Sequence, residues 1–288
     1  MTATPYLSPL DQLLALGMPQ TAEAHQDYTA LGISLEHVPE LIRLATDEEL
    51  RWGEASAEPA LWGPIHAWYA LGQFRAASAV EPLLGILYHI DADDDEWALE
   101  EMPEVFAQMG PAAIPALAAF LADADNRNDT AGTVSESLRR LAMRFPDSRA
   151  ECVSALMGRL EHFAENDEWL NASLIGDLTE LKAAEALSLM ERAFAAQVVD
   201  ETLRGDWEDI QIEFGLKTER DQPRKRRLLD GLMSPASWPA IAESAQAVPE
   251  HIRQWNEQVE ARKQAKALAQ VEKSVRQEEK GRRHRKKK

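Results

Sequence analysis

Cysteine is almost missing from this sequence of 288 residues, and long hydrophobic runs are missing altogether. The one thiol, Cys152, has no second cysteine with which to form a disulfide, and by itself it cannot build a cysteine-based zinc site. No apolar run approaches the roughly 18 residues that a membrane-spanning helix needs. Residues 1–17 also lack the basic start of a secretory signal, because the first charged side chain is Asp11. We therefore expect a cytoplasmic protein that does not enter a membrane.

Motifs of the common enzyme classes are missing too. The sequence contains no GxGxxG, no P-loop, no GxSxG elbow and no kinase signature. Its seven histidines form no HExxH and no i, i+4 pair, so we expect His66 to have a packing role in the first helix of a repeat. Cys152 precedes Val153 on a core-facing helix, and we expect it to be a buried small hydrophobic residue. The acidic runs that begin at Asp91 and Asp123 fail as EF-hand calcium loops, because Glu96 and Asn128 stand where the loop needs glycine. We expect no metal, no cofactor and no catalytic activity.

Glycine and proline are too few for an architecture of strands and turns, whereas the apolar and charged content is ordinary. Hydrophobic residues make up 45% of the chain and charged residues 28%, as in a globular protein with a sizeable core. The charge is uneven: residues 1–222 hold 14 Lys and Arg against 41 Asp and Glu, and residues 223–288 hold 17 against 8. An acidic body repels phosphate groups, so the body disfavours nucleic acid and the basic end does not.

A helical pattern of apolar residues recurs five times along the chain. Its clearest copy is Val80, Leu83, Leu84 and Leu87, whose i, i+3, i+4, i+7 spacing places them on one face of a helix. The five copies lie at residues 38–45, 80–87, 114–121, 153–160 and 187–194. Successive copies start 42, 34, 39 and 34 residues apart, which is the spacing of a helical repeat. Glu191 takes an apolar position in the fifth copy, as expected where such an array ends.

A second helix is predicted before each of the last four copies, at residues 64–72, 95–110, 130–145 and 167–182. Asp-Glu-Trp begins the second and fourth of these helices, and acidic residues are favourable at the positive end of a helix dipole. Pro39, Pro82 and Pro115 fall in the first turn of the apolar helices, where the missing N–H costs little. Helix, short turn and helix in repetition predict an all-α fold, an α-solenoid of about five helical hairpins.

The segments AVEPLLGIL at 79–87 and AIPALAAFL at 113–121 resemble one helix of HEAT-like repeats, in the short form of phycobilisome-lyase-like bacterial proteins. GDWEDIQIEFGL at 205–216 is similar to the segment that follows such repeats in uncharacterised bacterial proteins. The resemblance covers about residues 36–216 and implies an α-solenoid, but it leaves the function open because these arrays serve unrelated roles. A tetratricopeptide array fits less well, since Arg75 stands where that repeat has tyrosine.

Composition divides the chain into five parts. The expected divisions are an N-terminal segment at 1–35, the HEAT-like array at 36–216, a linker and irregular segment at 217–249, a charged helix at 250–279 and a basic disordered tail at 280–288. The apolar positions of the charged helix slip out of phase, which argues against a regular coiled coil.

Three tryptophans follow or stand between acidic residues, and two of them share a position in the repeat. The candidate partner-binding residues are Asp95, Glu96, Trp97, Asp167, Glu168, Trp169, Asp206, Trp207 and Glu208. The functional interpretation is an acidic ridge with exposed aromatic rings that docks another protein with a basic surface. The structural interpretation is that the rings seal neighbouring repeats and the acids begin helices. Both remain open at the level of sequence.

The basic tail offers a second kind of contact. Its candidate residues are Arg282, Arg283, Arg285, Lys286, Lys287 and Lys288. Such a cluster binds nucleic acid without sequence preference, or folds back on the acidic repeats. The leading hypothesis is a non-catalytic protein–protein interaction scaffold. The alternatives are a nucleic-acid or ribosome-associated factor acting through the tail, and a bilin-lyase-like or chaperone-like factor.

Overall fold

The computed structural model describes residues 5–19, 26–53, 57–92, 95–126 and 128–221. Every described residue belongs to one compact unit, Met1–Lys225. The predicted charged helix at 250–279, the basic tail at 280–288 and most of the predicted linker therefore lie outside the described residues.

The described part of the chain is all-α, as the sequence predicted, and it contains no strand. Its α-helices are α1 (Val38–Ala45), α2 (Glu48–Trp52), α3 (Gly63–Gln73), α4 (Val80–Ala92), α5 (Glu96–Met109), α6 (Ile114–Ala122), α7 (Asn128–Arg144), α8 (Arg149–Leu160), α9 (Glu168–Glu180), α10 (Leu187–Ala195), α11 (Glu201–Arg204) and α12 (Trp207–Glu213). The five predicted apolar helices are α1, α4, α6, α8 and α10, and the four helices predicted before them are α3, α5, α7 and α9. These nine predictions are confirmed.

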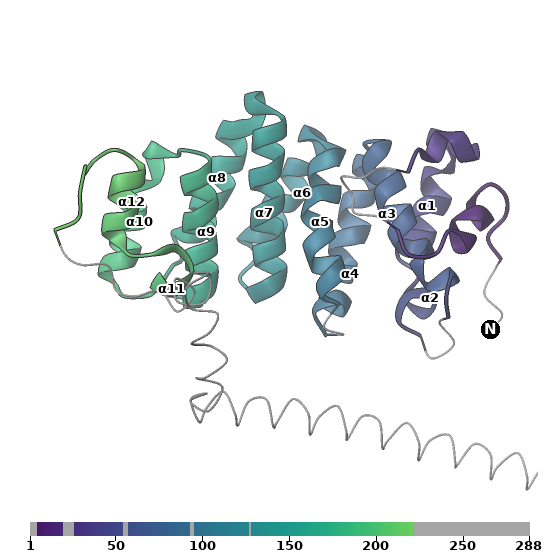
Figure 1. Ribbon diagram of the computed structural model, residues 1–288, viewed down its shortest axis with the longest axis horizontal. Helices are drawn as coiled ribbons and strands as arrows, with labels where there is room; N and C mark the ends of the chain where they lie inside the picture. Colours follow the sequence, from purple (N-terminus) through teal and green to yellow (C-terminus); the bar gives the residue numbers. More distant parts are fainter. Residues whose placement is uncertain (1–4, 20–25, 54–56, 93–94, 127, 222–288) are drawn as a thin grey trace, which may run out of the picture. The chain divides into compact units, whose positions relative to one another are not determined.

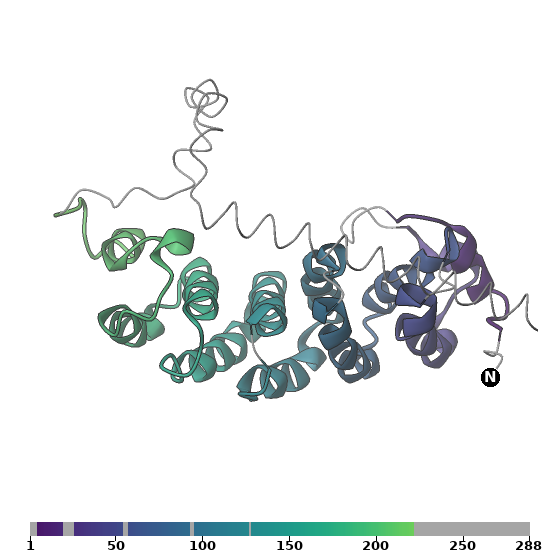
Figure 2. The same ribbon diagram turned by 90° about the horizontal axis from the view of Figure 1, so that it is seen from below.

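The helices of this unit pack in two rows (Figures 1 and 2). In one row α1, α3, α5, α7, α9 and α11 each contact the next, and in the other α4, α6, α8 and α10 do the same. Between the rows, α4 packs on α5, α6 on α7, and α8 on both α7 and α9. The sequence grouped each apolar helix with the helix before it, whereas the close packing of α4 and α6 is with the helix that follows.

A short 3-10 turn precedes each of the five apolar helices. These turns are Leu35–His37, Ala77–Ala79, Pro111–Ala113, Pro146–Ser148 and Ala184–Ala186. Arg75 and Lys182 lead into two of the turns with φ values of 51° and 52°, in the left-handed region. In both places the next amide closes the preceding helix, from Ala76 N to Leu71 O at 3.0 Å and from Ala183 N to Leu178 O at 2.9 Å. The same backbone connection therefore recurs at distant points of the chain.

The core follows the predicted apolar face. Leu83, Leu117 and Leu156 occupy the same position in three copies, and each has no exposed surface. Glu191, in an apolar position of the fifth copy, is exposed. Trp68 is also fully buried, and its Nε1 donates to Ala45 O at 2.7 Å, which ties α3 to α1. Burying leucine stabilises a fold by about 1.5–3 kcal/mol per side chain, so this repeated face contributes much of the stability.

Cys152 is buried, as predicted, and its burial raises the pKa of the thiol to about 11.

No single helix among the described residues has both the length and the apolar composition to cross a membrane. One bent pair, Trp97–Met109 with Pro111–Ala122 at 110°, meets those two criteria together.

Candidate functional site

Three aspartates begin the helices that carry the predicted tryptophans. Asp95 accepts a hydrogen bond from Ala98 N at 3.2 Å, Asp167 from Leu170 N at 2.6 Å, and Asp206 from Asp209 N at 3.2 Å. Each satisfies an amide that the first turn of a helix leaves without an internal partner. These acids therefore act within the fold, as the structural interpretation of the sequence expected.

Asp95 is also half of a buried ion pair. Its Oδ2 accepts from Arg51 Nη2 at 2.7 Å and from Trp52 Nε1 at 3.1 Å, and its side chain is 10% exposed. Trp97 is half-buried, with its ring edge-on to Trp62 at a centroid distance of 6.1 Å. Glu96 begins α5, and its side chain lies outside the described atoms. This end of the predicted acidic ridge is thus occupied by α2.

The acids around Trp207 are paired with basic residues of the same chain. Arg220 Nη2 lies 2.5 Å from Asp206 Oδ2, and Lys217 Nζ lies 2.5 Å from Glu208 Oε1. The hydrogen bond from Arg220 lowers the pKa of Asp206. Trp207 packs on Phe194 of α10 at 5.9 Å. The segment after α12 therefore neutralises this part of the ridge, although the sequence placed it in the linker.

The third group, at the start of α9, is the most open. Asp167 and Glu168 are exposed, and Trp169 is 39% exposed. The indole lies across Gly132 of α7, where an added Cβ would come within 2.6 Å of Cη2. Glycine at position 132 therefore lets the ring approach the backbone of the neighbouring helix. Trp169 combines both interpretations, because it seals α9 against α7 and still presents part of its ring to solvent.

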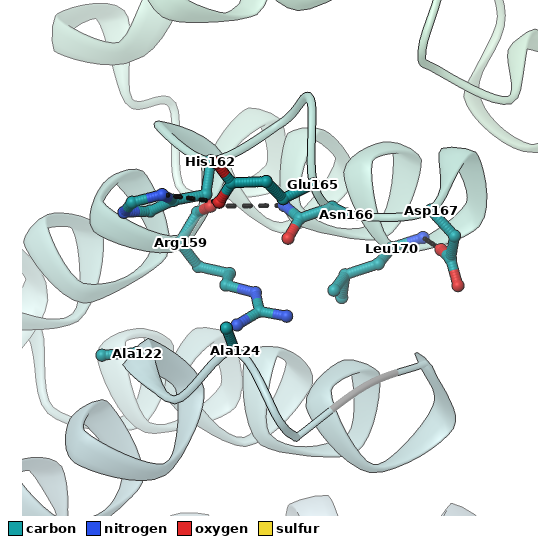
Figure 3. Close-up of a pocket in the computed structure, with 8 residues that line it drawn as sticks. All are labelled: Ala122, Ala124, Arg159, His162, Glu165, Asn166, Asp167 and Leu170. Carbon is teal, nitrogen blue, oxygen red and sulfur yellow. Dashed lines mark hydrogen bonds and ion pairs between the residues drawn. The ribbon is translucent and has the colours of Figure 1, made fainter.

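A hollow of about 620 Å³ lies between the ends of α6 and α8 and the start of α9 (Figure 3). Its floor is Arg159, a buried side chain whose Nη1 donates to Asp123 O at 2.9 Å and whose Nη2 donates to Asn126 O at 3.1 Å. At its rim, His162 Nδ1 lies 3.0 Å from Glu165 Oε2, and both side chains are mostly exposed. The guanidinium satisfies carbonyls after α6, so its position is explained by the fold.

A second hollow, of about 460 Å³, runs between α7 and α9; we call it the α7–α9 groove. Its lining residues are Leu99, Glu100, Gly132, Thr133, Glu136, Arg139, Trp169, Ala172, Ser173, Gly176, Asp177, Glu180, Leu203 and Arg204. Small side chains dominate where α7 and α9 face each other. The sequence pointed to Trp169 alone among these residues. Gly132 on α7, which faces Trp169 on α9, was the sequence signal that could have indicated the other residues of the groove.

Arg139 is the centre of the charged end of this groove. It lies 3.0 Å from Glu136, 2.9 Å from Asp177 and 2.8 Å from Glu180. Ser135 Oγ also donates to Asp177. Burial nevertheless raises the pKa of Asp177 to about 7, because loss of solvent outweighs the favourable effects of Ser135 and Arg139. Burial of Asp177 thus favours its uncharged form, whereas Arg139 and Ser135 favour the carboxylate.

Within the described ranges no group of three or more His, Cys, Asp or Glu side chains is arranged to hold a metal ion. Comparison with protein-family models finds no match, and neither the curated proteins nor the solved structures include a protein that matches the chain. The α7–α9 groove combines an apolar ring and small side chains with an ionic network.

Proposed function

We propose that this protein is a non-catalytic scaffold for protein–protein interaction, built as an α-solenoid of HEAT-like repeats. The observation that carries the proposal is the α7–α9 groove, with the exposed ring of Trp169 on a floor of small side chains. Stacked helical repeats offer long shallow surfaces that suit a protein partner better than a small substrate. Aromatic residues held in place by their neighbours are frequent centres of binding energy at such surfaces.

The repeat assignment is supported by the two rows of helices and by the recurring 3-10 turns. Arg75 and Lys182 introduce two of these turns with the same left-handed backbone. No family model matches the chain, so the HEAT-like class is proposed on the resemblance of the segments at 79–87 and 113–121 to phycobilisome-lyase-like repeats. The charge of the described unit favours a basic protein surface as partner.

Affinity capture from the cells that produce the protein tests this function. Tagged wild-type protein, Trp169→Ala and the control Tyr88→Ala, whose side chain on α4 is 71% exposed, are compared by mass spectrometry. We expect one protein to be retained by wild type and control and to be reduced about tenfold with Trp169→Ala. The purified partner should bind directly and keep its mass after incubation.

The main alternative predicts a different outcome. A nucleic-acid factor acting through the basic tail would retain nucleic acid at low salt, lose it at about 300 mM salt and ignore Trp169→Ala. That result, without a protein partner, would replace the scaffold by a nucleic-acid-binding role.

A further inference from the structure

The α7–α9 groove is apolar in one part and charged in another. Trp169 and Leu203, 39% and 41% exposed, belong to the apolar part. Glu136 and Glu180, with side chains 37% and 43% exposed, flank Arg139 in the charged part. Trp169 and Glu180 lie at the two ends of α9, roughly 16 Å apart at the helical rise of about 1.5 Å per residue. That distance accommodates about five residues of an extended peptide.

Negative charge is in excess in this groove. Glu100, Glu136 and Glu180 outnumber the two guanidinium groups of Arg139 and Arg204, and Asp177 adds to the excess only when it is ionised. Residues 1–222 as a whole carry 41 acidic against 14 basic side chains, so the field around the groove has the same sign. A positively charged ligand is attracted to the groove and a phosphate backbone is repelled.

Trp169 is in close contact with the neighbouring helix. Its ring packs on Gly132. The backbone carbonyl of the neighbouring residue Glu168 accepts a hydrogen bond from Asp200 N, at the start of α11, at 3.0 Å. A cation placed over an indole face is attracted to it by about 0.5–2 kcal/mol. A ring already in place loses little conformational entropy on binding.

We infer that the α7–α9 groove binds a short basic segment of another protein, with an apolar side chain against Trp169 and Leu203 and an arginine or lysine side chain beside Glu136 and Glu180. The inference rests on the proposed scaffold function and names the chemistry of the partner. Glu136 already pairs with Arg139 and Arg140, and Glu180 with Arg139 and Arg204. Both glutamate side chains remain partly exposed, so the partner cation joins this existing ionic network as a further charge. Binding therefore weakens as salt rises.

Titration calorimetry of the full-length protein with three synthetic peptides of about nine residues tests the inference. The peptides alternate leucine with arginine, glutamine or glutamate, and binding is measured at low and at about 300 mM salt. We expect the arginine peptide alone to bind, with an affinity reduced about tenfold by Glu136→Gln with Glu180→Gln and also by Trp169→Ala. The control is Glu151→Gln with Glu191→Gln, exposed glutamates on α8 and α10 outside the groove. Thermal unfolding of every variant checks that it is folded. Gly132→Ala displaces Trp169 without changing charge, and we expect it also to weaken binding of the arginine peptide.

Arginine-peptide binding that is equal in the groove variants and the control would overturn the assignment of the groove and leave the scaffold function standing. Absence of a protein partner in the capture experiment, with groove-dependent peptide binding intact, would overturn the scaffold function alone. Preference for the glutamate peptide would overturn the charge argument. Self-association that disappears with Trp169→Ala would assign the groove to a second copy of the chain instead.

Discussion

Tyr28 Oη and His66 Nδ1 lie 2.9 Å apart in the buried N-terminal part of the unit. The other ring nitrogen, Nε2, lies 2.9 Å from Gly17 O. Because a carbonyl oxygen only accepts, Nε2 carries a hydrogen. Burial lowers the pKa of His66 and so favours the neutral ring, whose Nδ1 then accepts from the tyrosine hydroxyl. His66 is therefore neutral and joins two N-terminal segments to α3, which supports the prediction that it is structural.

The first prediction concerns pH. Burial lowers the pKa of His66, so between this lowered value and the ordinary one near 6.5 the unfolded chain binds more protons than the folded chain. The contribution of His66 is therefore present above about pH 6.5 and is lost as the pH falls through that range. We expect His66→Ala to cost about 2–4 kcal/mol at pH 7.5 and less at pH 5, as measured by urea unfolding. His162→Ala, at an exposed position, should change stability little at either pH. An equal cost of His66→Ala at both pH values would contradict the neutral, buried imidazole.

A second prediction concerns the ion pair between Arg51 and Asp95. Asp95→Ala removes a helix cap and leaves Arg51 at a site where its side chain is 8% exposed, so we expect a loss of about 3–5 kcal/mol. Asp167→Ala is the matched control, since Asp167 caps α9 but is exposed, and we expect it to cost about 1 kcal/mol. Chemical denaturation measures both values. Similar losses for the two variants would show that Asp95 acts as a cap only.

The contact between Gly132 and Trp169 gives a third prediction. In Gly132→Ala the new methyl group would displace the indole, so acrylamide should quench the fluorescence of Trp169 more strongly than in the wild type. The helix propensity of alanine, better by about 1 kcal/mol, is offset by this displacement. Gly158→Ala in α8 has nothing within 4 Å of the new Cβ, and we expect a gain of about 1 kcal/mol. A gain of the same size in Gly132→Ala with unchanged quenching would contradict the close contact.

The carboxyl of Asp177 gives a fourth prediction. Its pKa is raised to about 7 by burial, so the folded chain binds more protons than the unfolded chain between about pH 4 and 7. This contribution is present at low pH and is lost as the pH rises through 7. We expect the carboxyl carbon of Asp177 to titrate near pH 7 by NMR, and Asp177→Asn to gain stability relative to wild type between pH 5 and 8. Glu151→Gln, at an exposed position, should show no such trend. Titration of Asp177 below pH 4 would show that Arg139 and Ser135 dominate.

Patterns local to one helix could be predicted from the sequence. The apolar pattern that contains Leu83 and Leu87 predicted the first residue of α4 correctly. The Asp-Glu-Trp sequences predicted where α5 and α9 begin. The acids at 95 and 206 could not be assigned, because their basic partners Arg51 and Arg220 are distant in sequence or lay in a supposed linker. A charge run alone does not say which of its members the fold neutralises.

The groove escaped prediction for a related reason. Gly132 and Asp177 become meaningful only when α7 and α9 lie side by side, and nothing in their own helices separates them from ordinary small or polar residues. Trp169 was found because tryptophan beside acids is uncommon. Register between neighbouring helices decides which small residue faces which ring, and that register depends on packing rather than on local propensity.

The shared connection at Arg75 and Lys182 makes the chain modular. Arg75 connects α3 of one row to α4 of the other, and Lys182 connects α9 to α10 in the same way. The same kind of backbone hydrogen bond closes the preceding helix at both places. Removing residues 76–182 would join Arg75 directly to Ala183, so that α3 would be followed by α10 with the same turn between them. A deletion or a duplication with both ends at this left-handed residue would therefore keep the backbone connection between the two rows intact.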